Sequence, residues 1–369
     1  MDLNAHLDEL NPCEAEAFRA VICRLRSIKE QPPSSELADR IITAAAAARR
    51  AERRHRLYWP WLGAAAAAAI AVTLSHVLRT PSAPSAPPPD ATLEWLAGAQ
   101  DADGTWSPAR HGGAETYRPA LTALSALTLA GTADGKYAPN VRRACDALAR
   151  LQSAEGAFGG DGRALYYNQA ITTFALASLY ESTPCPQPVI ERSLAFMLAR
   201  QSPEGGWDYE KNTGGNTAVT VWHVRALTCM ARQGFADADI PLRKALHWLR
   251  GTVREDGTIA YHRGSPVRSE SLNALAAYAL ITGGATYPQL VTMGQRMAGS
   301  IATGADSASS ADCYRDYAKI LALDAAGSGH EANKIRARML ANNRTARQDQ
   351  WQQVGGRLYT SALTSLAAR

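Results

Sequence analysis

A short apolar segment recurs six times in the C-terminal three quarters of the chain, at intervals of about 45 to 53 residues. Its copies lie at 120–124, 170–174, 218–222, 271–275, 317–321 and 362–366. Tyrosine stands three residues before four of the six copies, at Tyr117, Tyr167, Tyr314 and Tyr359. This spacing and the shared register predict a repeat protein in which each copy begins a buried helix.

A more amphipathic segment precedes each copy and predicts a second helix in every repeat. These helices are expected near 92–100, 140–152, 188–201, 241–250, 288–303 and 330–345. A single helix pair cannot bury its apolar face, so the six pairs must stack, with the apolar helices inside and the amphipathic helices outside. Alanine and leucine dominate the hydrophobic residues and favour helix. We therefore expect an all-α fold of six helix pairs over residues 91–369. Periodicity alone does not determine whether the pairs close into a ring.

The N-terminal quarter has a different pattern. Residues 61–78 are uncharged and mostly apolar, close to the about 20 residues that a bilayer-spanning helix needs. We predict a transmembrane signal anchor at 58–79, with the arginines between Arg49 and Arg56 holding the N-terminus in the cytoplasm. The alternative is a soluble alanine-rich helix, because alanine is only weakly apolar and His76 is unfavourable in lipid.

This prediction divides the chain into parts on two sides of a membrane. A linker rich in Pro, Ala and Ser follows the anchor at 80–90. Residues 1–57 would form a cytoplasmic segment of short helices, and residues 91–369 would lie outside the cytoplasm. We expect a single-pass protein of the bacterial inner membrane.

Composition and charge change this picture little. The net charge of +5 is concentrated in the arginine stretch before the anchor, where membrane topology explains it, so we expect no nucleic-acid partner. The six cysteines show no CxxC and no short pairing with histidine that would ligate a metal. We predict no metal site and no cofactor.

Three loops between paired helices share a Gln-x3-Gly-x-aromatic pattern, with a degenerate copy at 255–259. They run between Gln100 and Trp106, Gln152 and Phe158, and Gln201 and Trp207. The pattern resembles the QW motif of squalene-hopene and oxidosqualene cyclases and, loosely, the loops of prenyltransferase β subunits. That resemblance implies a closed (α/α)6 toroid. Glutamine can bond free backbone groups at a helix end and the aromatic ring packs on a neighbour, so we assign these six residues a structural role.

The catalytic residues of those enzymes are not found in the sequence. The cyclases use an Asp-x-Asp-Asp acid, whereas Asp101-Ala-Asp103 stops one carboxylate short. Asp312 and Cys313 are adjacent where prenyltransferases separate their zinc-binding Asp and Cys by one residue. We therefore expect a non-catalytic binding or sensing protein whose toroid takes an unknown ligand or protein. The alternative is an enzyme of the terpene cyclase or prenyltransferase class that acts on an isoprenoid at the membrane.

A polar position recurs inside the apolar helices, at Thr122, Thr172, Thr220, Asn273, Lys319 and Thr364. One interpretation is that each threonine bonds the carbonyl one turn back and merely packs. The other is that these residues, with His223 and the four register tyrosines, line a central cavity. An unpaired buried lysine is costly, so Lys319 should find Asp316 or water. His223 has a second reading as an ordinary core histidine.

The N-terminal segment suggests a partner of its own. A predicted helix after Pro33 carries Leu37 and Arg40 and leads through the arginine stretch into the anchor. This arrangement resembles bacterial membrane-bound anti-sigma factors and implies a sigma factor as partner of residues 1–57. The alternative is a short tail that only orients the anchor.

Overall fold

The computed structural model describes residues 89–132, 134–160, 162–183, 186–209, 214–303, 312–342 and 352–368. They belong to one compact unit, Ser85–Arg369. The predicted cytoplasmic segment 1–57 and anchor 58–79, and all but the end of the linker 80–90, lie outside the described residues. Among the described helices, none combines the length and the apolar character that a membrane crossing requires.

The described part is built from helices. The α-helices are α4 (Pro89–Gly98), α5 (Arg118–Ala130), α6 (Ala138–Leu151), α7 (Gly162–Leu179), α8 (Gln187–Leu198), α9 (Thr217–Arg232), α10 (Asp239–Arg250), α11 (Glu270–Gly283), α12 (Pro288–Thr303), α13 (Cys313–Ala325), α14 (Gly329–Asn342) and α15 (Gln352–Ala367). Short 3-10 turns η2 (Pro108–His111), η3 (Glu115–Tyr117) and η4 (Ala236–Ala238) lie between them. Extended pairing in the described residues is limited to two isolated bridges. The prediction of an all-α fold is confirmed.

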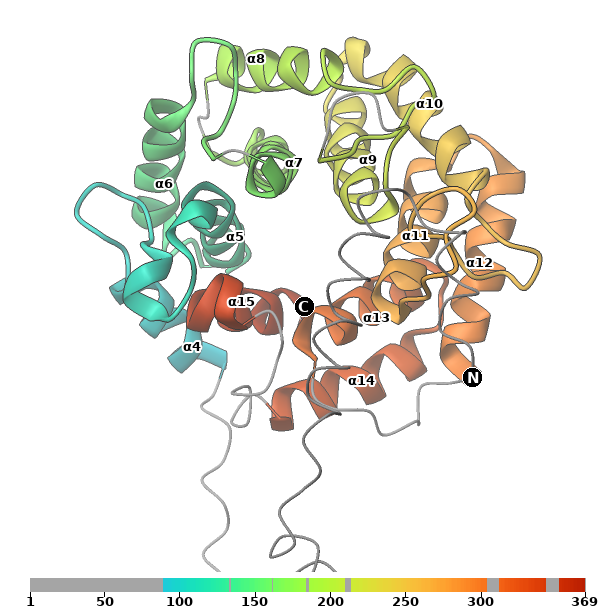
Figure 1. Ribbon diagram of the computed structural model, residues 1–369. Helices are drawn as coiled ribbons and strands as arrows, with labels where there is room; N and C mark the ends of the chain where they lie inside the picture. Colours follow the sequence, from blue (N-terminus) through green and yellow to red (C-terminus); the bar gives the residue numbers. More distant parts are fainter. Residues whose placement is uncertain are drawn as a thin grey trace, which may run out of the picture. The chain divides into compact units, whose positions relative to one another are not determined.

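The helices alternate between two concentric positions (Figure 1). The odd-numbered helices α5 to α15 pack side by side around a common centre, and α15 contacts both α13 and α5. The even-numbered helices pack on the outside of these inner helices. Each apolar segment of the repeat lies within an inner helix, but only α5, α9 and α11 begin within two residues of their segment, whereas α7 and α15 begin eight and ten residues before theirs.

Burial explains why the two kinds of helix differ in sequence. Every residue of α9 from Thr217 to Leu227 is buried, so this inner helix is surrounded by other parts of the protein on all sides. Outer helix α6 buries Val141, Cys145 and Leu148, which are spaced by about one turn, and exposes the arginines between them. An amphipathic stripe of this kind covers a core on one face and meets water on the other.

Contacts between the first and last repeats join the two ends of the helix array. Gly113, in the loop before α5, forms a bridge with Gly355 at the start of α15. Farther along the same helices, the Thr128 hydroxyl donates to the Ala362 carbonyl at 3.4 Å. The Arg357 guanidinium lies 4.0 Å from the ring centre of Trp95 in α4. α15 is therefore held by both neighbouring inner helices and by the first repeat.

Each Gln-x3-Gly-x-aromatic loop ties its repeat to the next outer helix. The Gln201 side chain donates to the Gly205 carbonyl in its own loop and to the Pro241 carbonyl in α10, both at 2.9 Å. Gln100 and Gln152 make the equivalent pairs of bonds. These bonds satisfy carbonyl groups and fix the spacing of successive outer helices.

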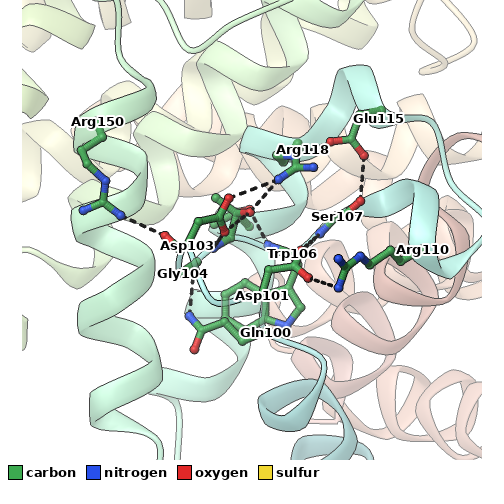
Figure 2. Close-up of polar contacts among 12 residues, drawn as sticks. Gln100, Asp101, Asp103, Gly104, Trp106, Ser107, Arg110, Glu115, Arg118 and Arg150 are labelled. Carbon is green, nitrogen blue, oxygen red and sulfur yellow. Dashed lines mark hydrogen bonds and ion pairs between the residues drawn. The ribbon is translucent and has the colours of Figure 1, made fainter.

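The aromatic residue of the loop links the two helices of its own repeat. The Trp207 indole donates to the Met197 carbonyl at the end of α8, and its backbone N–H donates to Thr220 in α9. Trp106 bonds in the same way, with its backbone N–H donating to the Thr122 hydroxyl. Figure 2 shows the first of these loops, where further charged contacts surround Gln100 and Trp106. These motif residues therefore bond backbone groups of the helices around them.

Candidate functional site

A cavity of about 360 Å³ opens at one end of the inner helices. Its walls come from the N-terminal parts of α5, α7, α9, α11, α13 and α15 and from the loops that precede them. Helix N-termini carry free backbone N–H groups and the positive end of the helix dipole, so this end of the fold favours ligands rich in acceptors. The volume falls within the ~300–1,000 Å³ typical of small-molecule sites.

Six tyrosines line the cavity, one from each repeat. They are Tyr117, Tyr167, Tyr209, Tyr261, Tyr314 and Tyr359. The hydroxyls of Tyr167 and Tyr209 lie 3.2 Å apart, and the Tyr261 hydroxyl donates to that of Tyr209 at 3.4 Å. A phenol offers a flat apolar face and a hydrogen-bonding tip, so this wall can contact an amphipathic ligand in both ways.

The sequence pattern identified four of these tyrosines and missed Tyr209 and Tyr261. In the third and fourth repeats, Gly215 and Arg268 occupy the register position, and the tyrosine lies in the preceding loop. A second signal was present, because Tyr209 follows Trp207 by two residues and Tyr261 follows Ile259 by two. Reading both positions together would have found one tyrosine in every repeat.

Arg163 and Trp222 add a charge and an indole to the cavity wall. The Arg163 guanidinium lies 4.9 Å from the ring centre of Tyr209. The Trp222 indole donates to the Tyr314 hydroxyl at 3.1 Å. Farther along the inner helices the wall is mainly aliphatic, with Leu124 and Leu363. The cavity is therefore polar and aromatic near the helix N-termini and apolar deeper inside.

The buried phenols keep their protons at neutral pH. Burial is the largest cause that raises the pKa of the lining tyrosines Tyr117, Tyr167, Tyr261 and Tyr314. For Tyr261, the hydrogen bond with Tyr209 raises the pKa further. These hydroxyls can consequently act as hydrogen-bond donors to a ligand, and none of them serves as a phenolate.

Two carboxylates lie next to lining residues in the sequence, although none of the described lining residues is itself a carboxylate. Asp208 precedes Tyr209, and Glu270 lies between two lining serines. The Lys319 ammonium donates to Glu270 at 2.8 Å, and this bond holds the pKa of Glu270 below its usual range. Asp208 accepts a bond of 2.6 Å from the Asn216 amide. Within the described residues, no three His, Cys, Asp or Glu side chains gather closely enough to hold a metal ion.

The recurrent polar side chains of the inner helices do not belong to the cavity wall among the described residues. Instead, several of them accept a bond from the backbone of the loop before their helix. Thr122 and Thr220 accept from the tryptophan N–H groups, and Asn273 accepts from the Ile259 N–H at 2.7 Å. In the second repeat, Gln169 takes this role toward Phe158, in place of Thr172. In the first, third and fourth repeats, this position therefore holds the loop that precedes the inner helix.

The other predicted site residues have individual explanations. His223 is buried, stacks on the Trp207 ring with centroids 4.5 Å apart and lies 3.0 Å from the Val219 carbonyl, as a core histidine does. Lys319 pairs with Glu270, whereas Asp316 or water was the expected partner. Thr364 is buried in α15 and does not belong to the cavity wall.

Comparison with known proteins finds a similar structure in a class of protein different from the one that the motif suggested. No family model matches the chain, and no curated protein matches its sequence. A solved structure of the GH76A α-1,6-mannanase from Salegentibacter sp. HEL1_6 is similar with a TM-score of 0.54 and 13% identity, over 76% of this chain and 97% of the mannanase. A protein from Actinoplanes matches at 19% identity with a TM-score of 0.49, over the same shares of the two chains.

The family resemblance drawn from the sequence was wrong. One similar structure is an α-1,6-mannanase, and neither of the two similar structures named above is described as a squalene cyclase, a prenyltransferase or an anti-sigma factor. The motif misled because its residues bond backbone groups of neighbouring helices, which any stacked helix pairs need. The expectation of a non-catalytic sensor coupled to a sigma factor is overturned with it, since the fold on which it rested is shared with a glycan-cleaving enzyme.

Proposed function

We propose that residues 89–369 form a closed (α/α)6 toroid with a glycoside hydrolase-like function, in which the central cavity binds a segment of a glycan. The observation that carries this proposal is the set of six tyrosines, one per repeat, around a cavity at the N-terminal ends of the inner helices. The likeness of the fold to an α-1,6-mannanase supports the carbohydrate class and makes mannose-containing glycans the first to test.

The cavity chemistry suits a sugar. A pyranose ring presents C–H groups on its faces and hydroxyls around its edge, so it needs aromatic faces and hydrogen-bonding groups at the same place. Tyr209 and Tyr261 provide both, and Arg163 adds donors beside them. Long apolar ligands fit less well, because phenolic hydroxyls and the Arg163 charge would lose water without a partner.

Cleavage of the bound glycan would require two carboxylates in different environments, one protonated and one ionised. Glu270 suits the ionised role of nucleophile or base, because the Lys319 bond lowers its pKa. Asp208, the other carboxylate next to a lining residue, has a largely buried side chain beside Tyr209. We propose these two residues as the pair to test.

The expected location fits this function. A segment at 58–79 that anchors the chain in the bacterial inner membrane would place the toroid among the glycans outside the cytoplasm. Protease digestion of intact spheroplasts tests this topology: cleavage of residues 91–369 supports the exported orientation, and protection until lysis contradicts it.

A glycan array and a hydrolysis assay, both with the full-length chain, test the function. We expect binding to a subset of glycans, and Tyr209→Ala should weaken it by about tenfold or more, as loss of one stacking and hydrogen-bonding contact implies. Tyr287→Ala is the matched control, because Tyr287 is an exposed tyrosine away from the cavity. Absence of binding to every glycan, or equal binding by the two variants, would overturn the proposal.

The hydrolysis assay separates binding from cleavage. Release of reducing ends from α-1,6-mannan or from an array glycan should fall at least 100-fold in Glu270→Gln and Asp208→Asn, while binding persists. Asp256→Asn is the control, since Asp256 lies in a loop outside the cavity wall. Undiminished cleavage in both carboxylate variants would refute their assignment.

A further inference from the structure

Arg225 is a buried charge without an anionic partner in the described part of the chain. It lies on α9, one turn beyond Trp222, and is 7% exposed. Its Nη2 donates to the Tyr317 hydroxyl at 2.6 Å. Its Nε and Nη1 are buried and have no acceptor among the described residues. The described carboxylates form no ion pair with it, although ion pairs elsewhere in the fold are numerous.

Aromatic rings from four inner helices surround this guanidinium. Its central carbon lies 4.3 Å from the ring centre of Phe174 in α7, 4.9 Å from that of Trp222, 5.3 Å from Tyr278 in α11 and 5.4 Å from Tyr317 in α13. A group in contact with α7, α11 and α13 as well as its own helix points into the centre of the inner helices. Trp222 lines the cavity, so Arg225 lies directly beneath the cavity wall.

The environment keeps the charge but does not balance it. Burial lowers the pKa of Arg225, yet the neighbouring tyrosines Tyr317 and Tyr278 raise it more, and the group stays protonated. Contacts with aromatic faces offset part of the cost of burying a cation. They do not accept bonds from Nε and Nη1, which lie on one planar group suited to an anion. Tyr317 accepts from Arg225 through its oxygen, so its own proton is available for the same anion.

We propose that Arg225 and Tyr317 bind a small monovalent anion inside the toroid, beneath the central cavity. The anion is a free halide or the carboxylate of an acidic sugar bound in the cavity above. The first source is independent of the proposed glycan function, whereas the second rests on it. In both cases, a negative charge at this place completes the hydrogen bonds of Arg225 and neutralises its charge.

Thermal unfolding of the full-length chain at constant ionic strength tests this site. Bromide in place of the bulkier methanesulfonate should raise the Tm by about 5 °C at saturation, because an anion that binds only the folded state stabilises it. Arg225→Met should abolish the rise, and Arg232→Met should keep it, since Arg232 is an exposed arginine on the same helix. A parallel series compares glucuronate with glucose.

The pattern of Tm changes distinguishes a free halide from the carboxylate of an acidic sugar. A rise with bromide alone identifies a free ion, and a rise with glucuronate but not glucose or bromide identifies an acidic sugar. Equal responses of the wild type and Arg225→Met, or no response to either anion, overturn the site whether or not the chain binds other glycans. If Arg225→Met does not fold, an anomalous-difference map of wild-type crystals in bromide and an electron-density map of crystals soaked in glucuronate decide together, because the proposal requires one of the two anions beside Arg225.

Discussion

His223 and Arg225 lie two residues apart on α9, and burial affects their charges differently. Burial lowers the pKa of His223 to about 4, so the ring is neutral and packs flat on Trp207. Arg225 cannot lose its proton and is surrounded by aromatic rings instead. The same buried helix therefore carries a histidine that burial makes neutral and an arginine that stays charged.

Acid should weaken the fold through His223. Its pKa is about 4 in the folded chain, against about 6.5 when unfolded, so the unfolded chain takes up the proton first. Stability is full above pH 6.5 and falls as the pH drops toward 4, by about 2 to 3 kcal/mol at pH 4.5. Urea unfolding at pH 7 and 4.5 measures this loss.

Two variants isolate the histidine in that measurement. His223→Phe keeps an aromatic ring against Trp207 but does not titrate. Between pH 7 and 4.5 this variant should therefore lose less stability than the wild type, by most of the about 2 to 3 kcal/mol. His247→Phe replaces an exposed histidine of α10 and should behave as the wild type does. An identical acid response in all three proteins would show that His223 does not carry the effect.

At the scale of the element, helices were easier to predict from the sequence than the functions of their polar residues. The predicted 288–303 helix coincides with α12, because its apolar positions repeat with the helical period. The recurrent Thr220 position left two interpretations open, packing within the helix or lining the cavity, and in the structure its hydroxyl bonds the loop before it. Periodicity gives the face of a helix, but it does not show whether a buried hydroxyl meets a ligand or a neighbouring backbone.

Substitution of the glycine in a Gln-x3-Gly-x-aromatic loop should lower the free energy of unfolding more than substitution elsewhere in that loop. Gly205 has φ +104, and a Cβ there would lie 2.4 Å from the Lys244 carbonyl of α10. Gly205→Ala should therefore cost about 3 kcal/mol or more, from the positive φ and the displaced outer helix together. Gly264→Ala has φ +78 but open space, and should cost only the ~1–2 kcal/mol of the backbone. Equal losses in urea unfolding would contradict the close approach.

At the scale of the whole molecule, the repeat predicted how many helix pairs there are but not the class of protein that they form. The repeat spacing indicated six pairs, and α15 packs on both α13 and α5. The aromatic loops suggested cyclases, whereas the similar solved structure is a mannanase. Stacked helix pairs need the same contacts between neighbouring helices whatever ligand they bind. These contacts therefore do not indicate which reaction or ligand the protein is built for.

Contacts between the first and last repeats should make the described unit unfold as one. Gly113 approaches Gly355 so closely that a Cβ on Gly113 would lie 2.6 Å from its carbonyl carbon. Gly113→Ala should lower the stability of the entire helical unit by about 1–3 kcal/mol in a single transition. Gly98→Ala, where nothing lies within 4 Å, should not be destabilising. A variant in which only the terminal helices unfold at lower urea would show that the repeats behave as an open array.

A crystal structure of the full-length chain soaked with α-1,6-linked mannotriose, or with the strongest glycan from the array, tests the proposed glycan site most directly. We expect sugar density among the six lining tyrosines, with a sugar hydroxyl within hydrogen-bond distance of Tyr209 or Tyr261. Density found only on the outer helices, with the tyrosine cavity free of sugar, would contradict this expectation.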